Sequence, residues 1–225
     1  MDLSKRAHWI FDMDGTLTVA IHDFDAIRQE LGLPEGRPIL EEIALRPERE
    51  ASELFHRLDR IELELARRAC ASEGAVELLE RLGARSARLG ILTRNSHANA
   101  LETLRVCGLL RFFDPACVVG REAAAPKPDP DGIRKLLGEW RAAPVEAVMV
   151  GDYRYDLLAG RAAATGKPQE CPHPGRKLQR IPRRRLHPCK TDTLRRLPRD
   201  ARHARPGADR RTGRRHRTAG RQLGH

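Results

Sequence analysis

The chain has 225 residues, enough for one domain with an insertion or two small domains, and a formal net charge of +11. This charge suggests nucleic-acid binding, but the basic excess lies in residues 166–225, whereas residues 1–165 are mildly acidic. The five cysteines are odd in number and lack a C-x-x-C pair. That pattern argues against a disulfide framework or a zinc site and suits free thiols in a reducing compartment. With no signal-peptide pattern and no apolar run of transmembrane length, we expect a cytoplasmic protein without a membrane partner.

The apolar run Trp9-Ile10-Phe11 predicts a short buried strand, and two carboxylates follow it at Asp12 and Asp14. On an extended chain, residues i and i+2 point to the same face, and Gly15-Thr16 then allows a sharp turn. Like charges about 4 Å apart repel by roughly 4 kcal/mol at an effective dielectric of about 20. Such a pair therefore requires a cation, a shared proton or open solvent. The alternative is a plain hairpin turn, for which Asp-Gly is a strong signal.

The stretch from about residue 23 to 83 is predicted to be mostly helical. Apolar residues recur there at helical spacing in three segments: Phe24, Ile27 and Leu31; Leu54, Leu58, Ile61 and Leu65; and Val76, Leu79 and Leu82. These stripes are most simply core positions, and we give them no catalytic meaning.

From residue 87 the pattern alternates between strands and helices. We expect strands at 87–92, 117–119 and 147–150, and helices at 97–106, 130–140 and 157–164. This alternation predicts an α/β fold with a mostly parallel sheet and helices on both faces. Ligands in such sheets bind at the carboxyl ends of the strands.

Polar clusters fall at these strand ends: Asp12-x-Asp14-Gly15-Thr16, Ile91-Leu92-Thr93, Lys127-Pro128 and Gly151-Asp152-x-x-x-Asp156. Each cluster has an ordinary explanation as a helix cap, a solvated loop lysine, or acids of a turn and a helix start. Together they fit phosphoryl transfer. One carboxylate can attack phosphorus, a second acid can protonate the leaving group, and a hydroxyl and a lysine can hold the transferred oxygens. Carboxylates and phosphate oxygens are also the ligands that Mg²⁺ prefers.

These residues resemble the haloacid dehalogenase-like superfamily, and within it the phosphoglycolate phosphatase-like group. Phe11-Asp12-Met13-Asp14-Gly15-Thr16-Leu17 resembles its first motif, Thr93 the second, Lys127 the third, and Gly151-Asp152 with Asp156 the fourth. The resemblance implies a Rossmann-like catalytic core formed by residues 1–18 and 84–165. It also implies a small α-helical cap, residues 19–83, inserted after the first strand.

The resemblance further implies a role for each residue at the strand ends. Asp12 would be the nucleophile and Asp14 the general acid and base, while Lys127 would steady Asp12 and the phosphate. An aspartate at position 14 favours phosphate-ester hydrolysis over dehalogenation.

The remaining roles concern ligand binding. The metal site for Mg²⁺ would comprise Asp12, Asp14 through its backbone carbonyl, Asp152 and Asp156. Substrate would bind to Thr93, Arg94, Asn95 and Lys127.

The expected function is Mg²⁺-dependent hydrolysis of small phosphate monoesters through an aspartyl phosphate. The expected partner is a phosphorylated small molecule and not a specific nucleic acid, and the chain is expected to be a monomer or homodimer. One alternative is a sugar phosphomutase, which shares every catalytic residue. Another is a non-enzymatic protein that binds polyanions through its basic C-terminal tail.

That tail, residues 166–225, lacks Phe, Trp, Tyr and Val and is dominated by Arg, Pro, Gly, Ala and His. Such a composition predicts disorder. The family continues after residue 164 with an edge strand and a closing helix, and no strand pattern follows here. Our hypothesis is that the tail results from out-of-frame translation or a similar replacement. Loss of an edge strand would expose the sheet and lower stability.

Overall fold

The computed structural model describes residues 6–165. The predicted disorder and out-of-frame origin of residues 166–225 lie outside the described residues. Its sheet has four parallel strands in the order β3-β2-β1-β4. The strands are β1 His8–Phe11, β2 Arg88–Leu92, β3 Val118–Val119 and β4 Ala147–Val150. The helices are α1 Phe24–Leu31, α2 Ile39–Ala44, α3 Glu48–Ala66, α4 Ala75–Ala84, α5 His97–Val106, α6 Asp131–Trp140 and α7 Arg154–Thr165. The predicted Rossmann-like α/β fold is confirmed. No helix within residues 6–165 is long and apolar enough to cross a membrane.

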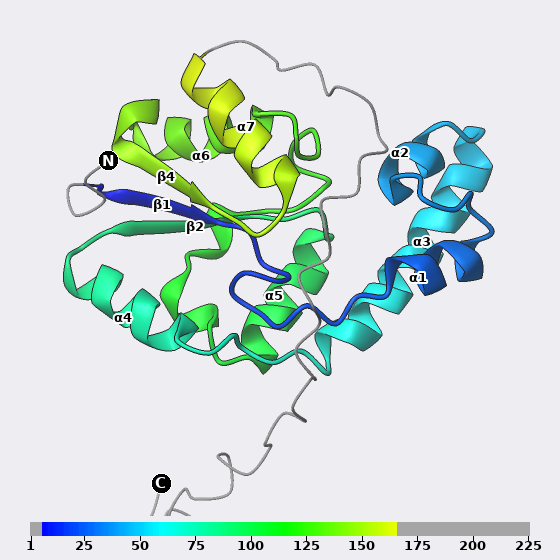
Figure 1. Cartoon of the computed structure of the whole chain (residues 1–225), viewed down its shortest axis with the longest axis horizontal. Coiled ribbons are helices and arrows are strands. Elements are labelled where there is room, and N and C mark those ends of the chain that lie inside the picture. The colour runs from blue at the N-terminus through cyan, green and yellow to red at the C-terminus, as the bar shows by residue number, and fades with distance from the viewer. Residues whose placement is uncertain (1–5, 166–225) are drawn as a thin grey trace, which may run out of the picture. The chain divides into compact units, whose positions relative to one another are not determined.

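Helices cover both faces of the sheet, as Figure 1 shows. Ile10 of β1 packs on one face with apolar side chains of α6 and α7. Its neighbours Trp9 and Phe11 pack on the opposite face with α4 and α5. Because β1 is buried on both faces, its sequence is a continuous apolar run without alternation.

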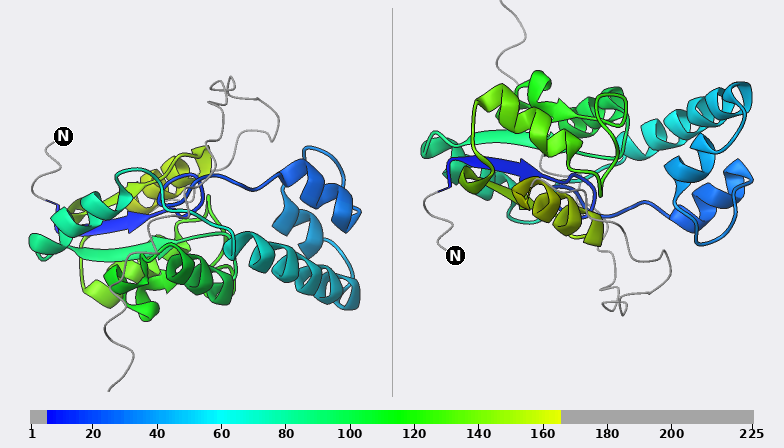
Figure 2. Two further views of the ribbon diagram at one scale, coloured as in Figure 1. Left: turned by 90° about the horizontal axis from the view of Figure 1, so that it is seen from below. Right: turned by 90° about the horizontal axis from the view of Figure 1, so that it is seen from above.

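The cap helices α1, α2 and α3 enclose a small apolar core of their own. Its buried residues include Ile27, Leu31, Ile43, Leu54 and Leu58. Figure 2 shows these helices grouped beyond the carboxyl ends of the strands. The spacing of the apolar stripes therefore predicted the part of the cap core that α1 and α3 supply, but not the part supplied by α2 and the loop before it.

Two details of the helical stretch differ from expectation. Phe24 was placed on the apolar stripe of the first helix, but it is 55% exposed. Helix α4 falls within the expected insertion 19–83, yet Leu79 and Leu82 pack with the sheet cluster rather than with the cap core. Sequence periodicity identifies the buried face of a helix but not the element that the face contacts.

β4 pairs with β1 and, among residues 6–165, with no further strand. All four of its residues are only partly buried. A hollow of about 200 Å³ next to it is lined in part by Phe11, Leu17, Leu78 and Val150. The sheet edge at β4 is therefore the least covered part of the described core.

The cysteines depart from expectation at one position. Cys107 and Cys117 carry free thiols. Cys70 is disulfide-bonded, so the expectation of free thiols is wrong for this residue.

Candidate active site

The ion pair between Lys127 and Asp12 lies at the carboxyl end of β1. The Asp12 backbone N–H donates to Val150 O at 2.8 Å, which holds the residue between β1 and β4. Lys127 Nζ donates to Asp12 Oδ1 and to Asp156 Oδ1, both at 2.6 Å. Lys127 is only 3% exposed, so it is not a solvated loop lysine. A buried ammonium shared by two carboxylates forms the centre of the site.

Three carboxylates lie close together after the carboxyl ends of β1 and β4. Asp12, Asp152 and Asp156 each offer an oxygen within 4.8 Å of the other two. Asp156, buried in the first turn of α7, accepts from the Tyr153 backbone N–H at 3.0 Å. Asp152 is exposed and accepts from Thr16 Oγ1 at 3.3 Å. This set of hard oxygen donors is the kind that binds Mg²⁺.

Burial raises the pKa of Asp12 to about 7. Lys127 acts in the opposite direction, while Asp156 and Asp14 add to the rise. An ionised Asp12 at neutral pH is therefore favoured by further positive charge at this site.

Two glycines allow the acids to approach. Gly15 has φ +91°, and a Cβ there would lie 2.5 Å from Asp152 Oδ2. A Cβ on Gly151 would lie 2.2 Å from Asp156 Cγ. Both positions therefore require glycine if the carboxylates are to keep their places.

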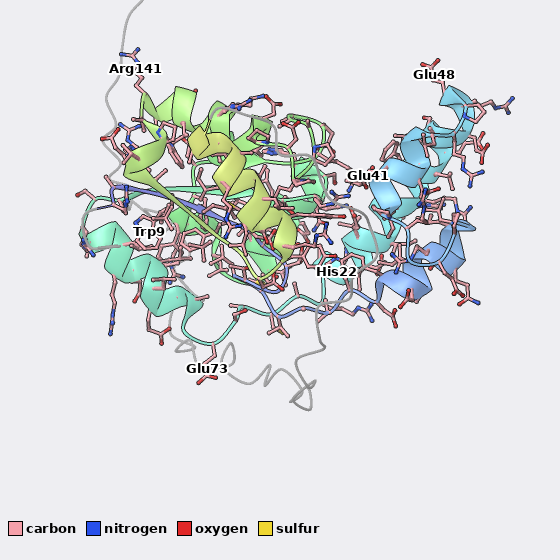
Figure 3. The ribbon with its side chains drawn as sticks, turned by 45° about the horizontal axis from the view of Figure 1, so that its top comes forward. Trp9, His22, Glu41, Glu48, Glu73 and Arg141 are labelled. Carbon is pink, nitrogen blue, oxygen red and sulfur yellow. The ribbon has the colours of Figure 1, made fainter. Side chains whose placement is uncertain are left out.

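Asp14 follows Asp12 by two residues but has different partners. Its Oδ2 accepts from Asn95 Nδ2 at 2.8 Å, and its Oδ1 accepts from Thr18 Oγ1 at 3.4 Å. His22 Nδ1 lies 3.7 Å from Asp14 Oδ1, and Figure 3 shows His22 near the start of the cap. Burial raises the pKa of Asp14, while His22 and Asn95 lower it. A raised pKa favours the protonated form that a general acid needs.

The loop after β2 carries the predicted substrate-binding residues. The Thr93 backbone N–H donates to Val119 O at 3.0 Å, and Thr93 Oγ1 accepts from the Asn95 N–H at 3.2 Å. The cap of α5 is Ser96, whose side chain accepts from the Asn99 N–H. Thr93 and Asn95 are therefore not the helix caps that the ordinary explanation required.

Arg94 connects this loop with the cap. Its guanidinium donates to the backbone carbonyl of Lys127 and to both carboxylate oxygens of Glu41, at 3.0 and 2.7 Å. Figure 3 labels Glu41, which belongs to cap helix α2. The side chain predicted to bind substrate is thus engaged by the cap in this structure.

Sequence reasoning missed Arg121 and Glu62. Their side chains are 7% and 8% exposed, and Arg121 Nη1 donates to Glu62 Oε1 and Oε2 at 3.0 and 2.8 Å. Burial raises the pKa of Glu62 to about 7. In the sequence, the signal for this pair is a carboxylate on an apolar stripe: Glu62 lies one helical turn after Leu58, on the buried face of the helix. A buried carboxylate there indicates a cation nearby.

Residues 24–166, well over half of the chain, match the family model described as haloacid dehalogenase-like hydrolase. The chain belongs to the haloacid dehalogenase-like hydrolases. The resemblance drawn from the motifs is confirmed at the level of this family, and the chain is a hydrolytic enzyme. The matched range begins after Asp12 and Asp14. Strand pairing brings β1, and with it these two acids, between β2 and β4 of the matched region.

Several relatives of this hydrolase are known. A Clostridium perfringens protein provisionally named pyrophosphatase PpaX is 27% identical over 169 residues, covering 68% of this chain and 78% of that protein. An uncharacterized hydrolase of Saccharomyces cerevisiae is 31% identical over 159 residues, covering 68% of this chain and 72% of that protein.

Solved structures show the same architecture. A hydrolase from Pseudomonas syringae matches with a TM-score of 0.60 and 26% identity, covering 71% of this chain and 81% of that chain. A provisionally named phosphoglycolate phosphatase from Lactobacillus plantarum matches with a TM-score of 0.59 and 20% identity, covering 71% of this chain and 83% of that chain. The second match, at this identity, shows the fold alone.

Proposed function

We propose that this hydrolase is a Mg²⁺-dependent phosphatase that acts on small phosphate monoesters through an aspartyl phosphate on Asp12. The observation that carries the proposal is the buried pair of Lys127 Nζ and Asp12 Oδ1, 2.6 Å apart at the end of β1, with Asp14 two residues away. A nucleophile, an acid and a fixed cation are the groups that phosphoryl transfer requires.

In the first half-reaction, an Asp12 carboxylate oxygen attacks phosphorus, and the bond from phosphorus to the leaving oxygen breaks. Asp14 gives its proton to that oxygen, so an alcohol leaves. Asn95 holds the Asp14 carboxyl through its hydrogen bond. Lys127 balances the charge that develops on the transferred oxygens.

In the second half-reaction, ionised Asp14 takes a proton from water. The water oxygen attacks phosphorus, the bond from phosphorus to Asp12 breaks, and inorganic phosphate leaves. Asp14 is then protonated and Asp12 is again a carboxylate, so the site returns to its starting state.

The donor chemistry fits Mg²⁺. Asp12, Asp152 and Asp156 would supply side-chain oxygens, and the backbone carbonyl of Asp14 is a further predicted ligand. The bound ion would offset the carboxylate charge and polarise the phosphoryl group. These ligand assignments remain predictions.

Substrate binding is assigned to Thr93, Arg94, Asn95 and Lys127. The Thr93 hydroxyl and Lys127 ammonium are suited to phosphoryl oxygens. The amide of Asn95 is directed at Asp14, and Arg94 is paired with Glu41, so these two assignments rest on the motif rather than on geometry. Cytoplasmic location and a monomeric or homodimeric state also remain predictions.

Inorganic pyrophosphate is a second candidate substrate, favoured by the name of the Clostridium perfringens relative. The same residues would serve. When Asp12 attacks one phosphorus of pyrophosphate, the bond to the bridging oxygen breaks and phosphate takes the place of the alcohol as leaving group.

A phosphate-release screen over phosphorylated metabolites and pyrophosphate, with and without Mg²⁺, tests the proposal. We expect release that stops on chelation and returns with Mg²⁺. Undiminished activity after exhaustive chelation would contradict the metal assignment. Isomerised product without phosphate release would indicate the phosphomutase alternative. Polyanion binding without any turnover would indicate the non-enzymatic alternative.

A further inference from the structure

A buried ion cluster joins cap helix α3 to the loop after β3. Arg121 donates through Nη1 to Glu62 and through Nη2 to Asp59 Oδ1, and both acids belong to α3. The loop is tightly seated, since a Cβ on the preceding Gly120 would lie 2.5 Å from the backbone nitrogen of His97. Arg121 is therefore fixed on the core side and reaches up to the cap.

The same arginine also holds the loop after β2. Arg121 Nη1 donates to Arg94 O at 3.2 Å, and the Arg121 backbone N–H donates to Asn95 O at 3.0 Å. Asn95 Nδ2 in turn donates to Asp14 Oδ2 at 2.8 Å. A continuous series of hydrogen bonds thus leads from two cap carboxylates to the proposed general acid.

We propose that Arg121 is a positioning residue that aims Asp14, through Asn95, while the cap is seated on the core. The inference rests on the proposed function, because it assigns Asp14 the role of general acid. A planar guanidinium can serve two carboxylates and a carbonyl at once, which an ammonium cannot do with the same geometry. Without Asp59 and Glu62, the Arg121 guanidinium would lose its cap partners and hold Arg94 O less firmly, whereas the bond from the Arg121 backbone N–H to Asn95 O does not depend on the side chain.

The competing explanation is that Arg121 only stabilises the fold. Removing one member of a buried ion pair is destabilising in either case, so stability does not separate the two. The dependence of the rate on the leaving group does separate the two explanations. An alkyl phosphate needs protonation of its leaving oxygen, whereas p-nitrophenyl phosphate needs little. A misplaced Asp14 therefore slows the alkyl substrate selectively.

The experiment compares kcat/KM, which covers all steps through leaving-group departure, on p-nitrophenyl phosphate and on the best alkyl phosphate from the screen. The test variants are Arg121→Gln on the core side and Glu62→Gln on the cap side. Asp14→Asn serves as the benchmark for a lost general acid. Arg105→Gln is the matched control, because it breaks an ion pair with Glu102 on α5 in which Arg105 is 63% exposed.

For Arg121→Gln we expect kcat/KM to fall about tenfold or more on the alkyl phosphate and about threefold or less on p-nitrophenyl phosphate, since a positioned acid contributes ~10²–10⁴. In the double variant, adding Arg121→Gln to Asp14→Asn should hardly change the ratio of kcat/KM for the two substrates any further, because both changes remove the same function. Glu62→Gln should shift the ratio in the same direction, and Arg105→Gln should leave it unchanged. Equal losses on the two substrates would overturn the proposal.

Amide hydrogen exchange gives a readout that does not depend on turnover. Exchange at residues 93–96 should be faster in Arg121→Gln than in the wild type, and unchanged in Arg105→Gln. Unaltered exchange in this loop would overturn the proposal. If Arg121→Gln does not fold, Glu62→Gln is measured in its place. A wild-type protein that releases no phosphate from either substrate would instead refute the proposed function, and the exchange result would then decide the role of Arg121 alone.

Discussion

Lys127 is the residue on which the buried charges depend. Its ammonium lies between Asp12 and Asp156, and the exposed Asp152 adds a third carboxylate to the group. One lysine balances only part of that charge. Burial raises the pKa of Asp12 to about 7, Lys127 opposes the rise, and the negative charges of Asp156 and Asp14 add to it.

Asp12→Asn keeps the shape of the side chain and removes the nucleophile. We expect phosphate release to fall to background while the circular dichroism spectrum stays that of the wild type. The metal-free variant should be somewhat less stable than the wild type, because the buried Lys127 ammonium keeps Asp156 but loses its second carboxylate partner. Sustained turnover by a variant preparation shown to be free of other phosphatases would refute the assignment of Asp12.

Gly151→Ala tests whether close backbone approach sets the acid geometry. The added Cβ would fall 2.2 Å from Asp156 Cγ, so the carboxylate that holds Lys127 must move. We expect a loss of about 10²-fold in kcat, as misplacement of about 1 Å in a catalytic group can produce. Gly138→Ala is the control, because its Cβ would meet nothing within 4 Å and α6 gains a better helix former. Equal activity of the two variants would contradict this account.

At the scale of elements, local sequence predicted much of the fold. The strand at 147–150 and the helix at 97–106 were predicted with the bounds that the structure has. The strand is an apolar run that ends at Gly151, and the helix has apolar residues at helical spacing and is followed by Gly108, so short-range pattern was sufficient. The contacts of α4 with the sheet, and those of Arg121 with Glu62, join residues far apart in the chain. Periodicity carries no information about such pairs. Asp12 and Asp14 could be listed because their motif ends a strand, and Lys127 because its motif precedes a helix. The partners of Arg94 and Asn95 could not be predicted in this way.

The contact between α3 and the core should respond to pH. Glu62 faces Arg121, Asp59 and Asn99, and burial raises its pKa from the ordinary 4.5 to about 7. Between these two pH values the folded chain binds more protons at Glu62 than the unfolded chain does. The contribution of Glu62 to the free energy of unfolding therefore falls as pH rises through that window.

Glu62→Gln removes this titration. The free energy of unfolding of the variant, relative to the wild type, should rise from about pH 5 to about pH 8, by on the order of 2 kcal/mol at ~1.4 kcal/mol per pKa unit. Denaturant unfolding at the two pH values measures the difference, and Glu53→Gln, on the same helix with a side chain that is 67% exposed, is the control. A relative stability that falls or does not change with pH would show that Glu62 is ionised throughout.

At the scale of the whole molecule, β4 at the edge of the sheet is the least buried of the four strands that the structure describes. Its four residues are partly buried, and the hollow beside Val150 is lined largely by apolar side chains. Exposed edges and apolar hollows favour association and lower stability. The candidate catalytic residues all precede residue 157 and lie in the part of the chain that the structure describes.

A chain ending at Thr165 tests how much residues 166–225 contribute. We expect kcat/KM within about twofold of that of the full chain, because every proposed catalytic side chain is retained. Trypsin should cut the full chain near Gly166 and leave an active fragment. A truncated chain that folds by circular dichroism but releases no phosphate would show that residues 166–225 take part in catalysis.

The central claim is the covalent step on Asp12, and chemical trapping tests it most directly. Enzyme quenched with acid during turnover is treated with borohydride, which reduces an acyl phosphate to an alcohol, and its peptides are then analysed by mass spectrometry. The account predicts homoserine at position 12, dependent on substrate and Mg²⁺ and absent from Asp12→Asn. A preparation that releases phosphate but yields no trapped product, or one trapped at another residue, would contradict it.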